Sequence, residues 1–415
     1  MSLDVLKTLF EQHFHAAPTR IQPLQGEFGG SGRKIIRLAN DRVTAVGILY
    51  GGREENVAFL AFSRHFRRHG LPVPEIYAED LDHGAYLEED LGDTTLFEFL
   101  CKNRTGENIA PAVVEAYRKV VAILPLFQVE AAGDLDYRVC YPAASFDRQS
   151  IAWDLNYFKY YFLRLAGIPF NEHALESDFN RLTDLLLSAP RDYFLYRDFQ
   201  SRNIMLRDDQ PYFVDYQGGR KGALQYDLAS LLFDAKADLP PELRDHLLYD
   251  YLRALANYIP VDREAFLHHF YAYVYVRIMQ ALGAYGYRGF FERRAHFLQS
   301  VPYALKNIRW LVHNRSIACR AAHAARRVPE HARFGKTQKH FFRSRQFGRP
   351  RFQFFLSPRI AQGRNRQRRR FYLRWPWPPE SGQGRTLQIT HGQGHAGHKL
   401  SASTGERASV PCRCV

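Results

Sequence analysis

The segment from Tyr193 to Asp227 constrains this chain more than any other. It contains two short apolar runs, 193–196 and 212–214, and an aspartate follows each run closely, at Asp198 and Asp215. Turn-forming polar residues precede the second run, so this part of the segment is predicted to be a β-hairpin. A hairpin turns the chain back on itself and therefore brings the two aspartates toward one another.

The spacing of the polar groups suits the transfer of a phosphoryl group. Asn203 lies between the two aspartates, five residues after Asp198. The pattern D-x-x-x-x-N followed by a strand that ends in Asp is the layout of a kinase catalytic loop. One carboxylate accepts the proton of the attacking hydroxyl, and the other oxygen groups bind Mg²⁺. We therefore predict that Asp198 is the base, that Asn203 and Asp215 are magnesium ligands, and that ATP is the donor. The alternative is a polar loop with acids there by chance.

Three motifs carry a family resemblance: R-D-F-Q-S-R-N-I-M, F-V-D-Y-Q and Q-Y-D-L-A-S-L-L. Together they resemble the aminoglycoside phosphotransferase (choline/sugar kinase-like) family. The form R-D-F-x-S-x-N looks most like the bacterial anomeric kinases that act on N-acetylmuramate and N-acetylglucosamine. The resemblance covers residues 20–312. Tyr196 replaces the usual kinase histidine, and Asp215-Tyr216-Gln217 replaces Asp-Phe-Gly; both departures favour a small-molecule substrate.

The resemblance implies an α+β, protein-kinase-like bilobal fold. Residues 1–92 are expected to form a small antiparallel β N-lobe, and residues 93–312 a mostly helical C-lobe. The pattern agrees, since 21–50 suggests three strands around a glycine-rich turn and helical periodicity begins after residue 93. Residues 313–415 are expected to be a basic tail of low order.

The nucleotide is expected at the glycine-rich turn, because glycines let backbone N–H groups approach phosphate oxygens. The residues of this turn that we assign to the nucleotide are Gly29, Gly30, Ser31 and Gly32. A tight turn with no ligand is the alternative. In the resembled family the strand near residue 88 is the hinge between the lobes. There main-chain groups, here those of Glu88 and Asp90, meet the adenine.

A kinase also expects a lysine on the strand 43–50, paired with a glutamate of the next helix. This chain has none there. Lys34 and Arg37 on the preceding strand are the substitutes, of which Lys34 is assigned to the nucleotide. Glu54 and Glu55 open the helix that follows. Either is a candidate partner, but we favour a role at the positive end of the helix dipole for both.

The aromatic-rich segment 141–170 is the candidate sugar site, since ring faces pack on sugars while polar tips bind hydroxyls. Asp154 and Asn156 are the candidate substrate contacts, because the family has an acidic residue at a like position. A core helix with a solvated face is the alternative. Structural roles are assigned to Arg197, beside the catalytic aspartate, and to Asp227. The family uses an aspartate there to stiffen the catalytic loop, and a helix N-cap is the alternative.

The bulk composition restricts the location. No run of 18 apolar residues exists, so no membrane partner is expected. The N-terminus indicates an amphipathic helix rather than a signal peptide. The five cysteines are odd in number and lack metal-binding spacing, which favours the cytoplasm.

The net charge of +14 is confined to the tail. Residues 320–415 hold 21 Lys and Arg against 3 Glu and no Asp, which leaves the rest slightly acidic. Three interpretations compete: an arm for nucleic acid, a solvated tail, or an out-of-frame translation. The third follows from back-translation, because shifting 363–382 and 391–400 by one nucleotide gives strings that resemble the C-terminal domain of the RNase adaptor RapZ. We favour it, so nucleic-acid binding is not expected of the chain as translated.

Together these features predict a cytoplasmic phosphotransferase that uses ATP and Mg²⁺ on a small-molecule hydroxyl, foremost that of an amino sugar. Two alternatives remain open at this stage. One is a nucleotide- or sugar-sensing pseudokinase linked to RNA regulation, which the missing strand lysine favours. The other is a kinase of aminoglycosides or other small molecules.

Overall fold

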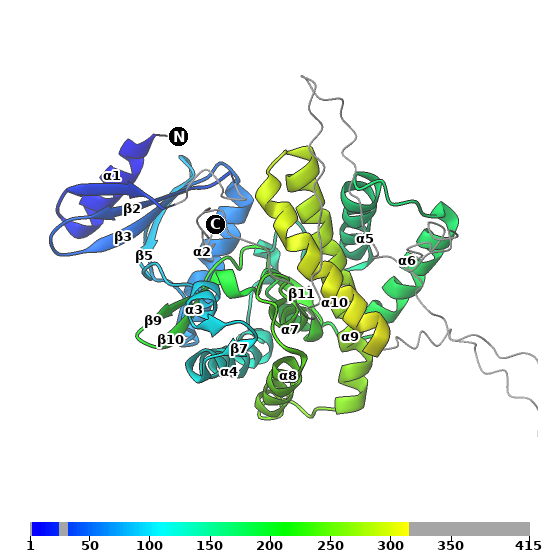
Figure 1. Cartoon of the computed structure of the whole chain (residues 1–415). Helices are drawn as coiled ribbons and strands as arrows, with labels where there is room; N and C mark the ends of the chain where they lie inside the picture. The colour runs from blue at the N-terminus through cyan, green and yellow to red at the C-terminus, as the bar shows by residue number, and fades with distance from the viewer. Residues whose placement is uncertain (1, 25–31, 315–415) are drawn as a thin grey trace, which may run out of the picture.

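The computed structural model describes residues 2–24 and 32–314, and these form two lobes. Figure 1 shows a β-rich lobe beside a larger helical lobe. Gly29, Gly30 and Ser31 of the expected phosphate loop, and all but the first two residues of the 313–415 tail, lie outside the described residues. Within the described part of the chain, no helix is long and apolar enough to cross a membrane.

The N-terminal lobe is one five-stranded antiparallel sheet with two helices. The sheet has the order β1-β2-β3-β5-β4. Its strands are β1 (Arg20–Pro23), β2 (Lys34–Ala39), β3 (Thr44–Leu49), β4 (Ile76–Asp80) and β5 (Ala85–Glu89). The helices are α1 (Leu3–Phe14) and α2 (Arg53–Arg68). Helix α1 packs its buried residues Leu6, Leu9 and Phe10 on the sheet, as its amphipathic pattern predicts.

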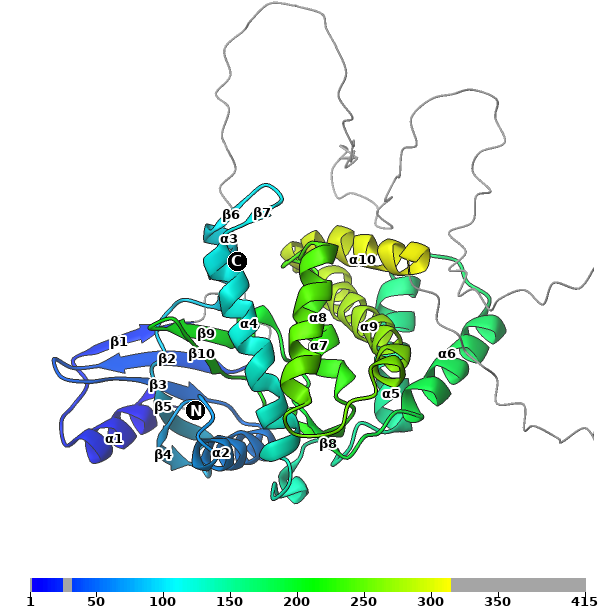
Figure 2. The same cartoon turned by 90° about the horizontal axis from the view of Figure 1, so that it is seen from below.

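The C-terminal lobe is mostly helical (Figure 2). Its longer helices are α3 (Leu96–Lys102), α4 (Pro111–Pro125), α5 (Arg148–Tyr157), α6 (Glu172–Leu187), α7 (Gln225–Leu232), α8 (Pro241–Leu255), α9 (Arg263–Gly286) and α10 (Val301–Asn314). Short helical turns are η1 (Leu126–Glu130), η2 (Tyr137–Val139), η3 (Phe158–Arg164), η4 (Ser201–Asn203), η5 (Tyr287–Phe291) and η6 (Ala295–Ser300). Its strands are β6 (Arg104–Thr105), β7 (Asn108–Ile109), β8 (Tyr193–Leu195), β9 (Ile204–Arg207), β10 (Gln210–Phe213) and β11 (Arg220–Gly222).

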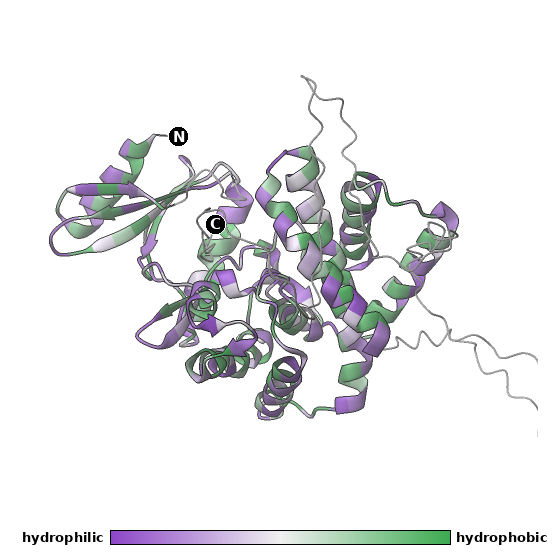
Figure 3. Ribbon diagram, in the orientation of Figure 1, coloured by the Kyte–Doolittle hydropathy of each residue, from purple (hydrophilic) through white to green (hydrophobic). Residues whose placement is uncertain are grey.

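One apolar cluster joins the two lobes. It runs from Phe59 and Phe66 of α2 through Phe127 to Phe213 beside the predicted catalytic loop. Figure 3 shows that most helices carry hydrophobic and hydrophilic residues on different sides. Each helix can therefore bury one side against its neighbours and leave the other to water. The apolar periodicity in the sequence is thus used to dock α2 onto the helical lobe.

The expected fold class is confirmed, with an antiparallel β N-lobe and a mostly helical C-lobe. The predicted hairpin is present as β9 and β10, whose register pairs Ile204 with Phe213. It is closed by Asp208 and Asp209, both in the left-handed region at φ 53° and φ 58°. Aspartate tolerates this conformation better than most residues, which explains why a polar, aspartate-rich turn stands there.

Candidate active site

The hairpin brings together the three side chains that the sequence singled out. The backbone N–H of Val214 donates to the carbonyl of Asn203 at 3.1 Å, which places the end of β10 beside the loop. The Nδ2 group of Asn203 then donates to the backbone carbonyl of Asp198 at 2.9 Å and to Oδ2 of Asp215 at 2.9 Å. Asn203 therefore connects the two aspartates.

The catalytic loop contains a strained residue that is held from behind. Arg197 has φ 83°, a conformation that costs a non-glycine residue free energy. The carboxylate of Asp227 accepts the backbone N–H groups of Tyr196 and Arg197 at 2.9 and 3.0 Å, and it also accepts from Gln128. Burial raises the pKa of Asp227 to about 7 despite these donors. The N-cap alternative is wrong, since Leu224 occupies that position and Asp227 lies inside the first turn of α7.

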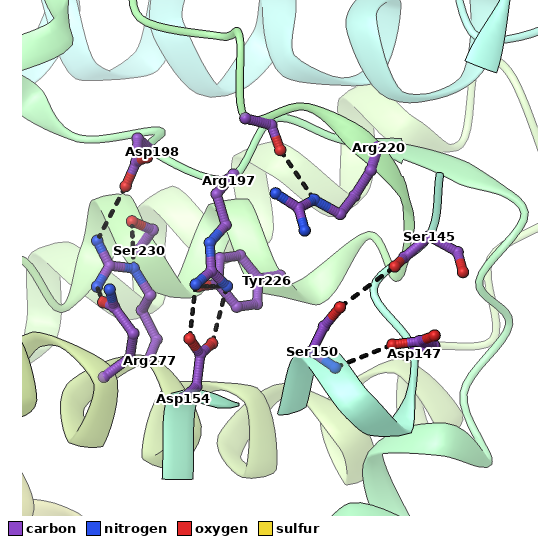
Figure 4. Close-up of polar contacts among 12 residues, drawn as sticks. Ser145, Asp147, Ser150, Asp154, Arg197, Asp198, Arg220, Tyr226, Ser230 and Arg277 are labelled. Carbon is purple, nitrogen blue, oxygen red and sulfur yellow. Dashed lines mark hydrogen bonds and ion pairs between the residues drawn. The ribbon is translucent and has the colours of Figure 1, made fainter. Parts of the chain in front are cut away.

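The side chain of Arg197 is anchored in the helical lobe (Figure 4). Its guanidinium makes a two-pronged ion pair with Asp154, at 2.6 and 2.8 Å, and donates to the hydroxyl of Tyr226 at 2.6 Å. Asp154 is buried. Asp154 therefore holds Arg197, and with it the candidate catalytic loop, in place. Its assignment as a sugar contact stays a prediction. Asn156, the other predicted contact, is half-buried two residues along.

Asp215 is also a strained residue, at φ 70°. Its Oδ1 accepts from Nε2 of Gln217 at 2.6 Å and lies 3.7 Å from Nη1 of Arg33. Burial, and then the charge of Asp198, raise the pKa of Asp215 to about 6. Two neighbouring carboxylates that repel each other are a site that gains from a bound cation.

Asp198 lies next to two polar side chains of the helical lobe. Its Oδ1 lies 4.0 Å from Nη2 of Arg277 (Figure 4). The same oxygen lies 3.5 Å from Nε2 of Gln200. Arg277 lies on α9, and its Nε donates to the hydroxyl of Ser230 on α7 at 2.9 Å, which fixes the guanidinium. Gln200 and Arg277 also line a small hollow of about 20 Å³. Its other walls are Ser230, Phe233, Asp234, Ala235, Ile278, Ala281, Tyr285 and Ala304. A hollow of this size has room for about one water molecule.

The cation on the opposite side of the site is Arg33. Its Nη2 donates to Oε2 of Glu55 on α2 at 2.6 Å, and its guanidinium lies over the ring of Tyr50 at 4.7 Å. The expectation that Glu55 only favours the helix dipole is therefore wrong, because this glutamate is the partner of a buried arginine. Lys34, the predicted substitute for the strand lysine, is exposed at the first position of β2.

Arg37, the other substitute, is used elsewhere. It makes a two-pronged ion pair with Asp90 at 2.6 and 2.8 Å and reaches Asp93 at 2.9 Å. This ties β2 to the segment between the lobes. The carboxylate of Asp90, a residue assigned to the nucleotide, thus pairs with Arg37. Only the main-chain groups of Asp90 are then available to contact adenine. That role stays a prediction, as does the role of Gly32, which is exposed.

Glu88, the remaining residue assigned to the nucleotide, is a buried acid on β5. Its Oε2 has no hydrogen-bond partner within the described residues. Burial raises the pKa of Glu88 to about 8, although the charge of Arg33 acts against this. Nε of Arg33 is likewise buried without a partner in the described part of the chain. Buried polar atoms left without partners are uncommon, and a bound ligand is one way to satisfy them.

Helix α2 is locked to the site by aromatic stacking. Phe59 lies between Tyr86 of β5 and Tyr216, with ring centroids 5.4 and 5.0 Å apart. The hydroxyl of Tyr216 also lies 2.6 Å from Oγ of Ser63. Because Tyr216 follows Asp215 directly, the position of α2 is coupled to the position of that carboxylate.

Sequence reasoning missed three contributors: Arg33, Gln217 and Arg277. Gln217 lies in the quoted motif F-V-D-Y-Q, and its two-residue spacing from Asp215 was a usable signal. Arg33 stands next to the residue that was chosen, and no local pattern separates the two. Arg277 lies within a long apolar helix, where one arginine among buried neighbours indicates a partner inside the protein.

The chain belongs to the Phosphotransferase enzyme family, whose sequence profile matches residues 29–265. It is 31% identical over 176 residues to the N-acetylmuramate/N-acetylglucosamine kinase of Pseudomonas aeruginosa. The aligned residues make up 41% of this chain and 47% of that protein. It is 29% identical over 199 residues to the kinase of the same name from Neisseria meningitidis serogroup B. That alignment makes up 47% of this chain and 56% of that protein. The matches thus span about half the length of these curated relatives.

A solved structure supports the fold independently of these relatives. The spectinomycin phosphotransferase in complex with ADP and spectinomycin superposes with a TM-score of 0.50 and 15% identity. The superposition covers 74% of this chain and 94% of that chain. At this identity the likeness concerns the fold alone.

Proposed function

We propose that this protein transfers the γ-phosphoryl group of ATP, with Mg²⁺, to a hydroxyl group of an amino sugar. The observation that carries the proposal is the convergence of Asp198, Asn203 and Asp215 at one end of a hairpin, next to a hollow. Family membership and the sugar kinases among the relatives support this class of reaction.

Asp198 acts on the acceptor hydroxyl. Its side chain is 38% exposed, so an acceptor hydroxyl can reach it from the solvent side. The carboxylate accepts the proton as the hydroxyl oxygen attacks phosphorus, and the terminal oxygen of ADP leaves. Arg277, with Nη2 4.0 Å from Oδ1 of Asp198, is placed to orient this base.

Asn203 and Asp215 fit a magnesium ion. Both hydrogen bonds of Asn203 use Nδ2, which leaves Oδ1 as the atom that a cation would bind. Asp215 is a carboxylate whose side chain is 39% exposed, and desolvation together with the charge of Asp198 raises its pKa. Mg²⁺ prefers such oxygen ligands, and when bound it neutralises charge on the phosphate oxygens.

Arg33 supplies the positive charge that the missing strand lysine would bring. Its side chain is 11% exposed and lies between Glu55 and Asp215, with Nη1 3.7 Å from Oδ1 of Asp215. Arginine binds phosphate through several donors in one plane. The pairing with Glu55 holds it on the phosphate side of the cleft, as the lysine–glutamate pair does in other kinases.

The proposed acceptor position is the exposed side of Asp198, because the hollow of about 20 Å³ nearby is too small for a sugar ring. The polar groups that line this hollow, Gln200, Ser230, Asp234 and Arg277, are candidates to orient the acceptor. Arg277 also suits an acidic sugar, since its charge faces the hollow. Asp154 and Asn156 lie behind the catalytic loop and are secondary candidates for hydroxyl contacts.

The test is turnover of ATP by the full chain with Mg²⁺ and a panel of acceptors: N-acetylmuramate, N-acetylglucosamine, neutral hexoses and aminoglycosides. We expect turnover with an amino sugar and its loss, by at least about 10³-fold, in Asp198→Ala, because the general base is removed. Binding of ATP, measured by calorimetry, should survive in that variant. Turnover with aminoglycosides only would contradict the acceptor, and nucleotide binding without turnover on any acceptor would contradict the reaction.

A further inference from the structure

A second cluster of ligating side chains lies at the far end of α2, away from the catalytic loop. His65 and His69 are four residues apart on this helix, so they share one face. Their rings lie with centroids 4.7 Å apart. Asp134, from the turn that follows η1 in the helical lobe, faces both. The cluster therefore joins the two lobes through three side chains.

The distances in this cluster suit a shared ion. Oδ1 of Asp134 lies 2.9 Å from Nε2 of His69 and 3.6 Å from Nε2 of His65. The three ligating atoms all lie within 4.8 Å of one another. Two ligands of one tetrahedral zinc ion are about 3.3 Å apart, given bonds of about 2.0–2.1 Å. To bind one ion, the two histidine rings would move closer together. The side chain of Asp134 is 67% exposed, so it has room to move with them.

We infer that His65, His69 and Asp134 form a binding site for a divalent transition-metal ion, of which Zn²⁺ is the representative. Two imidazoles and one carboxylate are the donor set that such ions take, with water completing the coordination. The site is separate from the proposed magnesium site, and its ligands are nitrogen-rich where the magnesium ligands are all oxygen. This inference goes beyond the proposed function and does not depend on it.

The surroundings decide how the ion would bind. His65 is buried, and burial lowers its pKa, which favours the neutral ring that a metal ligand needs. Its Nε2 makes a hydrogen bond of 2.7 Å to the carbonyl of Ala131, which the metal would replace. That carbonyl oxygen remains beside the site as a further donor. Nη2 of Arg68 lies 3.5 Å from Nδ1 of His65, so one positive charge stands close to the site.

A bound ion would fasten α2 to the turn at 131–134. The same helix carries Glu55, the partner of Arg33, in its first turn, and Phe59, which stacks on Tyr216. Metal at the far end would therefore reduce the freedom of α2 relative to the helical lobe. We expect Zn²⁺ to raise the melting temperature of the full chain.

The test is calorimetric titration of ZnCl₂ into the metal-stripped full chain, compared with His69→Ala and Asp134→Asn. Both residues are partly or largely exposed, so these variants should fold. Because the sequence beyond residue 314 holds further histidines and cysteines, the informative quantity is the difference between variants. We expect each variant to lose one zinc site or to bind it at least about tenfold more weakly, since even outer-shell changes cost 10–100-fold.

His83→Ala is the matched control. His83 also pairs with an aspartate, Asp80, at 2.7 Å, but no third ligand belongs to that pair within the described residues. It should keep the zinc binding and the Zn²⁺-dependent rise in melting temperature of the wild type. Equal stoichiometry and affinity in the wild type, His69→Ala and Asp134→Asn would overturn the site and leave a pH-sensitive ion pair.

Discussion

The two sides of the proposed active site are built in different ways. The catalytic side, Asp198, Asn203 and Asp215, comes from one folded-back segment, and a hairpin register fixes its geometry. The nucleotide side assembles Arg33 from the edge of β2, Glu55 from α2 and Glu88 from β5. The first depends on local chain geometry, and the second on how a helix packs on a sheet. The catalytic side should therefore respond to changes in its backbone anchors, and the nucleotide side to changes in charge.

Removing the anchor of the catalytic loop should have the largest effect on stability. Asp227→Ala leaves the buried N–H groups of Tyr196 and Arg197 without acceptors. We expect the free energy of unfolding to fall by about 2–6 kcal/mol, from about 1–3 kcal/mol for each of the two N–H groups left unpaired. Urea unfolding measures this. Asp147→Ala, which removes one N-cap bond to Ser150, is the control and should cost about 1 kcal/mol. Equal losses would show that the anchor is no more than a cap.

Adjacent cations offer a test of the nucleotide side. Arg33→Ala removes a charge that is 11% exposed, whereas Lys34→Ala removes an exposed one. We expect kcat/KM for ATP to fall by about 10²–10³-fold in Arg33→Ala, in line with losses on removing one charge-stabilising group, and to change little in Lys34→Ala.

The partner of Arg33 should report on the same interaction. If Glu55 acts by holding Arg33, then Glu55→Gln added to Arg33→Ala should have almost no further effect on kcat/KM for ATP, since coupled residues are not additive. A larger loss in Lys34→Ala than in Arg33→Ala would instead restore the assignment made from sequence.

The smallest effect concerns Glu88. Because burial raises its pKa to about 8, this side chain is neutral at pH 7, and Glu88→Gln should leave activity nearly unchanged there. The folded form holds the proton more tightly than the unfolded form, so Glu88 lowers stability as the pH rises from about 4.5 to about 8. Unfolding by urea at several pH values should show the wild type losing stability relative to Glu88→Gln across this window, at up to about 1.4 kcal/mol per pH unit. A constant difference would mean that Glu88 is ionised throughout.

Most of the fold was predictable because its signals are local. The periodicity of α1 and α2 and the polar turn at Asp208 and Asp209 each lie within a short stretch of chain. The roles of Asp154 and Asp227 were not predictable from spacing. Both are aspartates in helical patterns, and only the structure shows that one pairs with Arg197 and the other accepts two backbone N–H groups.

The sequence by itself determined the candidate catalytic set, since Asp198, Asn203 and Asp215 stand at fixed offsets around a hairpin whose register follows from chain geometry. Only the tertiary structure decided that Arg33 rather than Lys34 faces the site. Neighbouring residues on a strand point to opposite sides, and the packing of α2 on the sheet determines which side becomes the interior. The same packing placed Glu55 against Arg33, and His65 and His69 against Asp134, because these contacts join segments that no local pattern connects.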